Sequence, residues 1–143
     1  MENTKDMTYL ELTRKYRTKG YRLKSYGKIK EVCKEHESHG KVRKSHQAYT
    51  LYKLVINPRH KKTLLITTGF HGEEFNGPIS LLEIIDVVAA YAKKMRVRLV
   101  IYICVNPSGF DLHQRYNASG EKQNNDFMRY VIKGGKLVGM LKK

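Results

Sequence analysis

The sequence predicts an α/β fold with a mixed β-sheet and flanking helices, and three observations lead to this prediction. Residues 49–56 and 62–68 are rich in β-forming residues and are separated by a turn at Asn57-Pro58. Residues 79–94 form a long, mostly apolar run that is typical of a buried helix. Residues 96–105 form a further strand, nearly continuous in valine, isoleucine and leucine, as in a central strand covered on both faces. Strand, helix and strand in this order predict a right-handed βαβ unit.

The other elements are predicted from local signals. Apolar and aromatic residues between Thr8 and Lys19 predict a short helix that Gly20 ends. Residues 26–32 alternate loosely and predict a strand, and residues 49–68 are expected to form a hairpin. Asn76 is the expected N-cap of the long helix. From residue 106 to about residue 125 the chain is polar, and we expect a loop.

Composition indicates one globular domain over residues 1–143, with 41% hydrophobic and 29% charged residues. The longest apolar stretch, residues 79–92, is shorter than a bilayer span and contains two acidic residues, so we expect no membrane segment. The polar N-terminus does not resemble a signal peptide. Cys33 and Cys104 lack metal-site spacing and are expected to be free thiols. These features predict a cytoplasmic protein.

The formal net charge is +15, from 28 basic and 13 acidic residues. Such a charge favours anionic partners, and a nucleic-acid-binding module is therefore one alternative. Ten tyrosines could supply stacking surfaces for bases. However, the basic residues are spread along the chain, as on solvated surfaces, and no recognised nucleic-acid-binding motif is present.

A candidate metal site lies between a predicted strand and the long helix, where α/β proteins place ligands. His71 and Glu74 are three positions apart in this turn, so both side chains are expected to point to one side. Imidazole nitrogen and carboxylate oxygen are good zinc ligands, and two of them leave room for a third protein ligand and a water molecule. The spacing alone is weakly specific. A structural loop histidine, and helix N-terminal charges at Glu73 and Glu74, are the alternative interpretations.

A second stretch, residues 106–127, makes the metal hypothesis stronger. It contains Asn106-Pro-Ser-Gly109, then Arg115-Tyr-Asn117, and then a segment with Gly, Asn and Phe at matching positions from residue 120. Together with His71-Gly-Glu-Glu74, these elements resemble the zinc carboxypeptidase superfamily, which includes the succinylglutamate desuccinylase and aspartoacylase branch. The resemblance covers residues 50–130 and depends on the order of four elements, none of which is diagnostic alone.

The resemblance implies roles for individual residues. His71 and Glu74 would bind Zn²⁺, and Arg115 would stabilise the oxyanion that develops on the substrate carbonyl. A surface salt bridge is the alternative role for Arg115. Asn124 falls where the family holds the terminal carboxylate of the substrate, but Asn125 stands where the family has an arginine. Arg129 is a candidate for the missing cation. Peptides with a free C-terminus, N-acyl amino acids and cell-wall peptides all remain candidate substrates.

The family's third zinc ligand, a histidine, and its general-base glutamate lie downstream of these motifs and have no evident counterpart here. Among the remaining histidines, His113 is the one nearest the matched elements. The sequence therefore predicts the truncated, N-terminal portion of a hydrolase of the metallocarboxypeptidase type. A complementing C-terminal half or a homo-oligomer would complete it. The alternatives are a basic nucleic-acid-binding module and a catalytically inactive interaction module.

Overall fold

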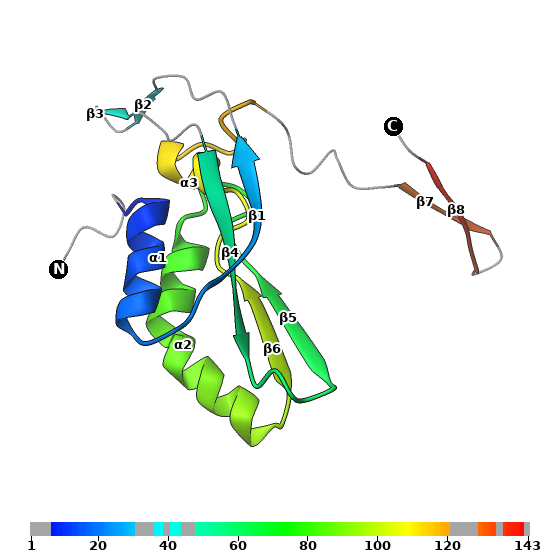
Figure 1. Cartoon of the computed structure of the whole chain (residues 1–143). Coiled ribbons are helices and arrows are strands. Elements are labelled where there is room, and N and C mark those ends of the chain that lie inside the picture. The colour runs from blue at the N-terminus through cyan, green and yellow to red at the C-terminus, as the bar shows by residue number, and fades with distance from the viewer. Residues whose placement is uncertain are drawn as a thin grey trace.

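Four strands form the main sheet of the computed structural model, which describes residues 7–30, 36–38, 41–43, 48–120, 129–133 and 136–141. The strand order is β1-β4-β6-β5 (Figure 1). β4 pairs antiparallel with β1 and β6, and β5 pairs parallel with β6. The predicted mixed sheet is thus confirmed. The strands are β1 (Lys24–Lys30), β4 (Ala48–Ile56), β5 (Thr63–Thr67) and β6 (Arg98–Tyr102).

Two further pairs of short strands are antiparallel. β2 (His36–Ser38) pairs with β3 (Lys41–Arg43), and β7 (Arg129–Lys133) pairs with β8 (Lys136–Leu141). The structure gives the backbone course of these four strands.

The first predicted helix is confirmed as α1 (Tyr9–Thr18). Its start is a capping box, in which the Glu11 amide donates to the Thr8 hydroxyl over 3.3 Å and the Thr8 amide donates to the Glu11 carboxylate over 2.7 Å. The helix ends before Gly20, whose φ of 86° lies in the left-handed region that glycine favours.

The βαβ unit is confirmed, but the predicted hairpin over residues 49–68 is wrong. β5 leads through α2 (Asn76–Lys94) into β6, which lies parallel to β5. β6 also pairs with β4 and therefore lies between the two strands that were expected to pair with each other. The residues of the turn at Asn57-Pro58 connect strands that are not neighbours in the sheet.

Two expectations about α2 are also corrected. Asn76 is the first helical residue, whereas the N-cap position is Phe75 and carries no side-chain capping bond. The helix buries one face against the sheet, while Ile84, Val87 and Tyr91 on other faces are 51%, 58% and 62% exposed. α2 therefore carries more apolar side chains than the sheet covers.

The segment after residue 106 was expected to be a loop, but it begins with a short helix, α3 (Pro107–Leu112), whose residues are all buried. Asn106 caps this helix, because its side-chain oxygen accepts a hydrogen bond from the Gly109 amide over 3.0 Å. Pro107 occupies the first helical position, where its missing N–H costs no intrahelical bond.

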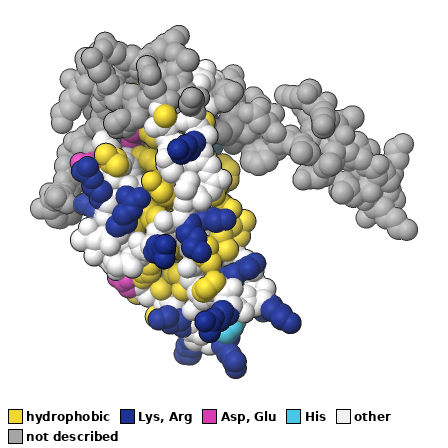
Figure 2. Space-filling view, viewed as in Figure 1, with side chains coloured by type: hydrophobic (Ala, Val, Ile, Leu, Met, Phe, Trp, Pro, Cys, Tyr) yellow, Lys and Arg dark blue, Asp and Glu magenta, His cyan; other side chains and the backbone are white. Residues whose placement is uncertain are grey.

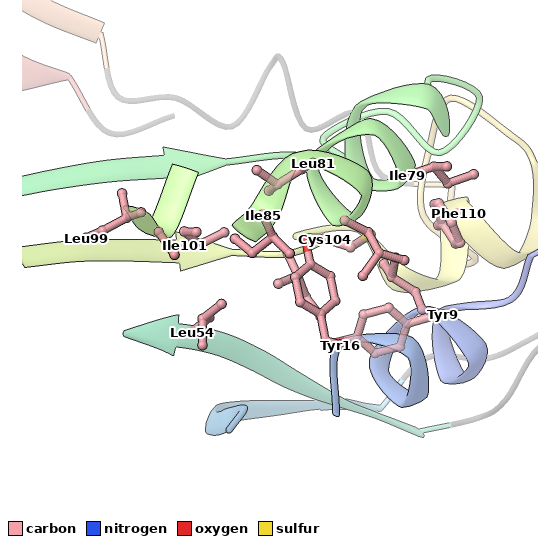
Figure 3. Close-up of a cluster of buried hydrophobic side chains, with 14 of the residues drawn as sticks. Tyr9, Tyr16, Leu54, Ile79, Leu81, Ile85, Leu99, Ile101, Cys104 and Phe110 are labelled. Atoms are coloured by element: carbon pink, nitrogen blue, oxygen red, sulfur yellow. The ribbon is translucent and has the colours of Figure 1, made fainter. Parts of the chain in front are cut away.

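The core lies between the sheet and the two longer helices, as Figure 3 shows. α1 lies against β4, where the Tyr9 ring packs edge-on against the Tyr49 ring, and α2 contacts β6. Fully buried members include Leu12, Tyr16, Ile85, Leu99 and Ile101. Among the described residues, no helix combines the length and the apolar character that crossing a bilayer requires.

Two buried groups extend this core toward α3. Cys104 is a free thiol, as predicted, and burial raises its pKa to about 12; Cys33 lies outside the described residues. The buried carboxylate of Asp111 accepts hydrogen bonds from the Tyr9 amide over 2.6 Å and from the Tyr49 hydroxyl over 3.2 Å. Asp111 therefore ties the start of α1 and the start of β4 to α3.

Candidate metal-binding site

The loop between β5 and α2 carries the predicted metal-binding residues at the carboxyl end of β5. A hollow of about 570 Å³ opens there, lined by Thr67, Thr68, Gly69, Phe70, Glu73, Glu74, Asn76 and Gly77. Ligands of α/β proteins commonly bind beyond the carboxyl ends of the strands, and this hollow lies at that position.

The segment after β6 holds this loop in place through backbone and side-chain hydrogen bonds. The Val105 amide donates to the Thr68 carbonyl over 3.0 Å, and the Asn106 amide donates to the Gly69 carbonyl over 3.0 Å. The Asn106 side-chain amide then donates to the Phe70 carbonyl over 3.1 Å. Three consecutive carbonyls are thus fixed by two residues, and the first and second motifs form one structural unit.

Two glycines allow the close approach of the loop to this segment. Gly72 lies directly against the backbone of Gly109, and any Cβ at position 72 would overlap it. Gly69 has a φ of 70°, and a Cβ there would lie 2.7 Å from the sulfur of Cys104. Glycine is therefore required on both sides of His71. These tertiary contacts carry no signal in the local sequence beyond the glycines themselves.

His71 and Glu74 point toward each other, as their spacing predicts. His71 Nδ1 lies 3.0 Å from Glu74 Oε1, and the Glu74 amide donates to the His71 carbonyl over 3.1 Å within the same turn. The His71 side chain is 13% exposed and the Glu74 side chain is 65% exposed. The pair is therefore reachable from solvent through its carboxylate. Its role as a metal site stays a prediction.

The separation of 3.0 Å between His71 Nδ1 and Glu74 Oε1 is a hydrogen-bond distance. Zinc–nitrogen and zinc–oxygen bonds of about 2.1 Å at a tetrahedral angle place two ligand atoms about 3.4 Å apart. The two atoms would therefore exchange their direct contact for bonds to the metal and move apart. The donor types also fit, since zinc accepts both imidazole and carboxylate.

A third donor does not join the pair within the described part of the chain, where no three His, Cys, Asp or Glu side chains gather in a metal-binding arrangement. His113, the nearest alternative from the sequence, ends α3 in a left-handed conformation with a φ of 51°. Its ring lies 5.7 Å from the ring of Phe75. The His113 ring thus packs against Phe75, the residue that precedes α2.

Arg115 reaches the same loop by an ion pair with Glu73. Arg115 Nη1 lies 3.1 Å from Glu73 Oε1, and the two side chains are 47% and 48% exposed. An exposed pair of this kind contributes only about 0–1 kcal/mol, so the guanidinium can exchange Glu73 for another anion. From the sequence, we expected Glu73 only to place negative charge at the start of the helix, because nothing local indicates a partner 42 residues away.

The three predicted substrate-binding residues are not placed by the structure. Asn124 and Asn125 lie outside the described residues, and Arg129 is described only as the first backbone position of β7. Their roles therefore stay predictions.

Comparison with protein families matches residues 60–130 to the succinylglutamate desuccinylase/aspartoacylase catalytic domain. This range contains the His71 and Asn106 motifs and Arg115. No curated protein gives a significant match.

Similar solved structures include three candidate metallopeptidases from Shewanella species. The protein of S. amazonensis SB2B is 29% identical with a TM-score of 0.53, over 91% of this chain and 42% of that one. The protein of S. denitrificans OS217 is 25% identical with a TM-score of 0.55, over 86% of this chain and 40% of that one. The protein of S. baltica OS155 is 28% identical with a TM-score of 0.52, over 91% of this chain and 41% of that one. The chain thus spans less than half the length of these proteins. Residues 60–130 of this chain are thus similar to that catalytic domain, and the fold of the chain matches part of the metallopeptidase structures, in agreement with the predicted resemblance.

Proposed function

We propose that this chain supplies the metal-binding and carbonyl-binding part of a zinc-dependent hydrolase of the metallocarboxypeptidase type, acting on amide or peptide bonds. The observation that carries the proposal is the His71–Glu74 pair, whose ligand atoms lie 3.0 Å apart at the carboxyl end of β5. The hollow beside it is lined by Glu74 and gives a substrate access to that position. Peptides and N-acyl amino acids are the proposed substrates.

Each residue has a distinct task in this proposal. His71, with a neutral ring, and Glu74, as a carboxylate, would hold the zinc ion. A zinc ion bound there supplies Lewis-acid polarisation and lowers the pKa of bound water. Arg115 would leave Glu73 and donate to the carbonyl oxygen of the substrate, where negative charge develops. Its planar, permanently charged guanidinium suits this role better than an ammonium group. Asn124, Asn125 and Arg129 are the proposed contacts of the substrate carboxylate.

A catalytic zinc site of this class has three protein ligands, and hydrolysis needs a general base. We therefore propose that a complementing segment or a second chain provides the third ligand and the base. A cytoplasmic location stays a prediction.

Hydrolysis assays with the zinc-loaded protein test this proposal, with and without any downstream coding sequence of its gene. We expect zinc-dependent cleavage of N-acyl amino acids or C-terminal peptide bonds in the completed protein. Glu74→Ala should abolish it, and Arg115→Met should lower kcat by about 10²–10³-fold through loss of oxyanion stabilisation. Glu83→Ala, an exposed position on α2, is the matched control and should retain full activity. Full activity of Glu74→Ala would contradict the ligand assignment.

The alternative of a basic interaction module is supported by the net charge of +15. Figure 2 shows Lys and Arg side chains spread among apolar and neutral surface on the visible face. Nucleic-acid binding with a steep salt dependence, together with zinc binding that His71→Ala leaves unchanged, would favour this alternative.

A further inference from the structure

A second hollow, with a volume of about 250 Å³, lies between α1 and β4. Its walls are Tyr9, Leu10 and Thr13 of α1 and four residues between Ala48 and Tyr52 of β4. It shares no lining residue with the hollow at the metal-binding loop. Leu10 is 44% exposed and Ala48 is also exposed, so the hollow is open to solvent at its rim. We call it the α1–β4 pocket.

The pocket forms in the half of β4 that does not pair with β6. β6 pairs with β4 only from Lys53 to Ile56. In the preceding half, the Tyr9 hydroxyl takes the place of a strand, because it donates to the Thr50 carbonyl over 2.9 Å and accepts from the Tyr52 amide over 3.2 Å. A side chain, and not a neighbouring backbone, thus joins α1 to this part of β4, and space remains beside its ring.

The hydroxyl groups of the pocket walls are bonded within the protein. The Thr13 hydroxyl donates to the Leu10 carbonyl over 2.8 Å, and the Tyr49 hydroxyl donates to the Asp111 carboxylate over 3.2 Å. Burial raises the pKa of Tyr9, so its hydroxyl stays neutral. The rings of Tyr9 and Tyr49 meet edge to face, with centroids 6.1 Å apart and planes at 63°. The walls therefore offer aromatic surface to a flat, apolar group.

A cation lies at the Tyr52 end of the α1–β4 pocket. Thr13 and Arg17 follow Leu10 by three and seven positions on α1, so the three residues share one face of the helix. The guanidinium carbon of Arg17 lies 4.9 Å from the centroid of the Tyr52 ring, and this cation–π contact holds the charge beside the pocket. Within the described segments, no carboxylate lies at salt-bridge distance from Arg17. Its N–H groups therefore remain open to an anion.

We propose that the α1–β4 pocket binds a small aromatic carboxylate, with its ring against the tyrosines and its carboxylate on Arg17. The size fits, because an apolar cavity of about 150 Å³ is enough to hold benzene. The pocket volume of about 250 Å³ leaves room for a carboxyl group as well. A guanidinium can hold this group through two parallel N–H···O bonds. A neutral aromatic compound would leave the cation unpaired, and an aliphatic acid would leave the rings uncovered, so both parts of the pocket select the same class of ligand.

Calorimetric titration of the full chain with benzoate tests the proposal. A chelator is present throughout, so that a metal ion at His71 and Glu74 contributes nothing to the binding. We expect saturable binding at one site with a dissociation constant of about 1 mM or lower. Benzyl alcohol keeps the ring without the charge, and acetate keeps the charge without the ring. Each should bind at least about 10-fold more weakly than benzoate. Intermolecular NOEs should connect the benzoate ring to the rings of Tyr9 and Tyr49.

Variants of the same chain separate the pocket from general charge attraction. Arg17→Gln should weaken benzoate binding at least about 10-fold and leave the binding of benzyl alcohol unchanged. Arg22→Gln removes the same charge from an exposed arginine that does not line the pocket, and Arg115→Gln removes the arginine of the candidate metal site. Both should bind benzoate like the wild type. Ala48→Phe fills the rim and should block benzoate and benzyl alcohol alike. Circular dichroism checks that each variant folds.

Four results would overturn the proposal. The first is a wild type without saturable benzoate binding up to about 10 mM. The second is an equal loss in Arg17→Gln and Arg22→Gln, which would indicate attraction by the net charge alone. The third is loss of binding in Arg115→Gln, which would assign the ligand to the candidate metal site. The fourth is acetate binding as tight as benzoate binding, or benzoate binding that Ale48→Phe leaves intact, because the ring would then lie outside the pocket.

Discussion

Gly72→Ala is expected to lower the free energy of unfolding by roughly 3 kcal/mol. The added Cβ would overlap the backbone of Gly109, so one of the two segments must move. A flexible side chain could adjust at little cost, but here the neighbour is the main chain of α3. The shift would also displace His71, and zinc binding should weaken together with stability. Urea unfolding followed by circular dichroism measures the change.

Gly77→Ala is the matched control, five residues along the same loop and helix start. A Cβ at position 77 would meet nothing closer than the Cβ of Thr68, at 3.9 Å. Position 77 is helical, and alanine has a higher helix propensity than glycine. We therefore expect unchanged or higher stability, by up to about 1 kcal/mol. Equal losses in the two variants would show that the contact of Gly72 with Gly109 is not the cause.

Asp111→Ala is expected to have a similarly large effect, roughly 2–4 kcal/mol, because it removes the buried acceptor of the Tyr9 amide and the Tyr49 hydroxyl. Asp111→Asn keeps one acceptor oxygen and should lose less. Asp86→Ala removes a carboxylate whose side chain is 62% exposed and that bonds to Lys19 and Tyr21, so it should cost far less stability than Asp111→Ala. A loss for Asp111→Ala as small as that for Asp86→Ala, in the same unfolding experiment, would contradict the anchoring role.

The βαβ unit could be predicted because its signals are local and strong. The apolar run of α2 and the continuous β-formers of β6 each identify their own element. The order of strands could not be predicted. β4 and β5 are neighbours in the sequence, yet β6 lies between them in the sheet, and this depends on pairing between distant segments.

α3 was missed because its polar residues resemble those of a loop. Ser108 and Asp111 are buried and accept tertiary hydrogen bonds; the Ala118 amide, for example, donates to the Ser108 hydroxyl oxygen over 2.9 Å. The capping pair Asn106-Pro107 was a readable helix-start signal.

At the candidate site, the convergence of His71 and Glu74 followed from their spacing in one turn. The pairing of Glu73 with Arg115 did not, because the two residues come from segments that only the fold brings together. The same holds for Gly72, whose need for glycine arises from α3. Spacing within one turn is thus readable from sequence, whereas contacts between segments require the structure.

Zinc titration by calorimetry, on the protein completed by the segment or chain that supplies the third ligand, tests most directly whether His71 and Glu74 bind one cation. We expect His71→Ala and Glu74→Ala each to weaken zinc binding strongly. The loss should exceed the roughly 10–100-fold that is typical when a residue hydrogen-bonded to a metal ligand is removed. His60→Ala, in the turn at the opposite end of β5, should bind zinc like the wild type. Equal zinc affinity in the wild type, His71→Ala and Glu74→Ala would contradict the proposed site.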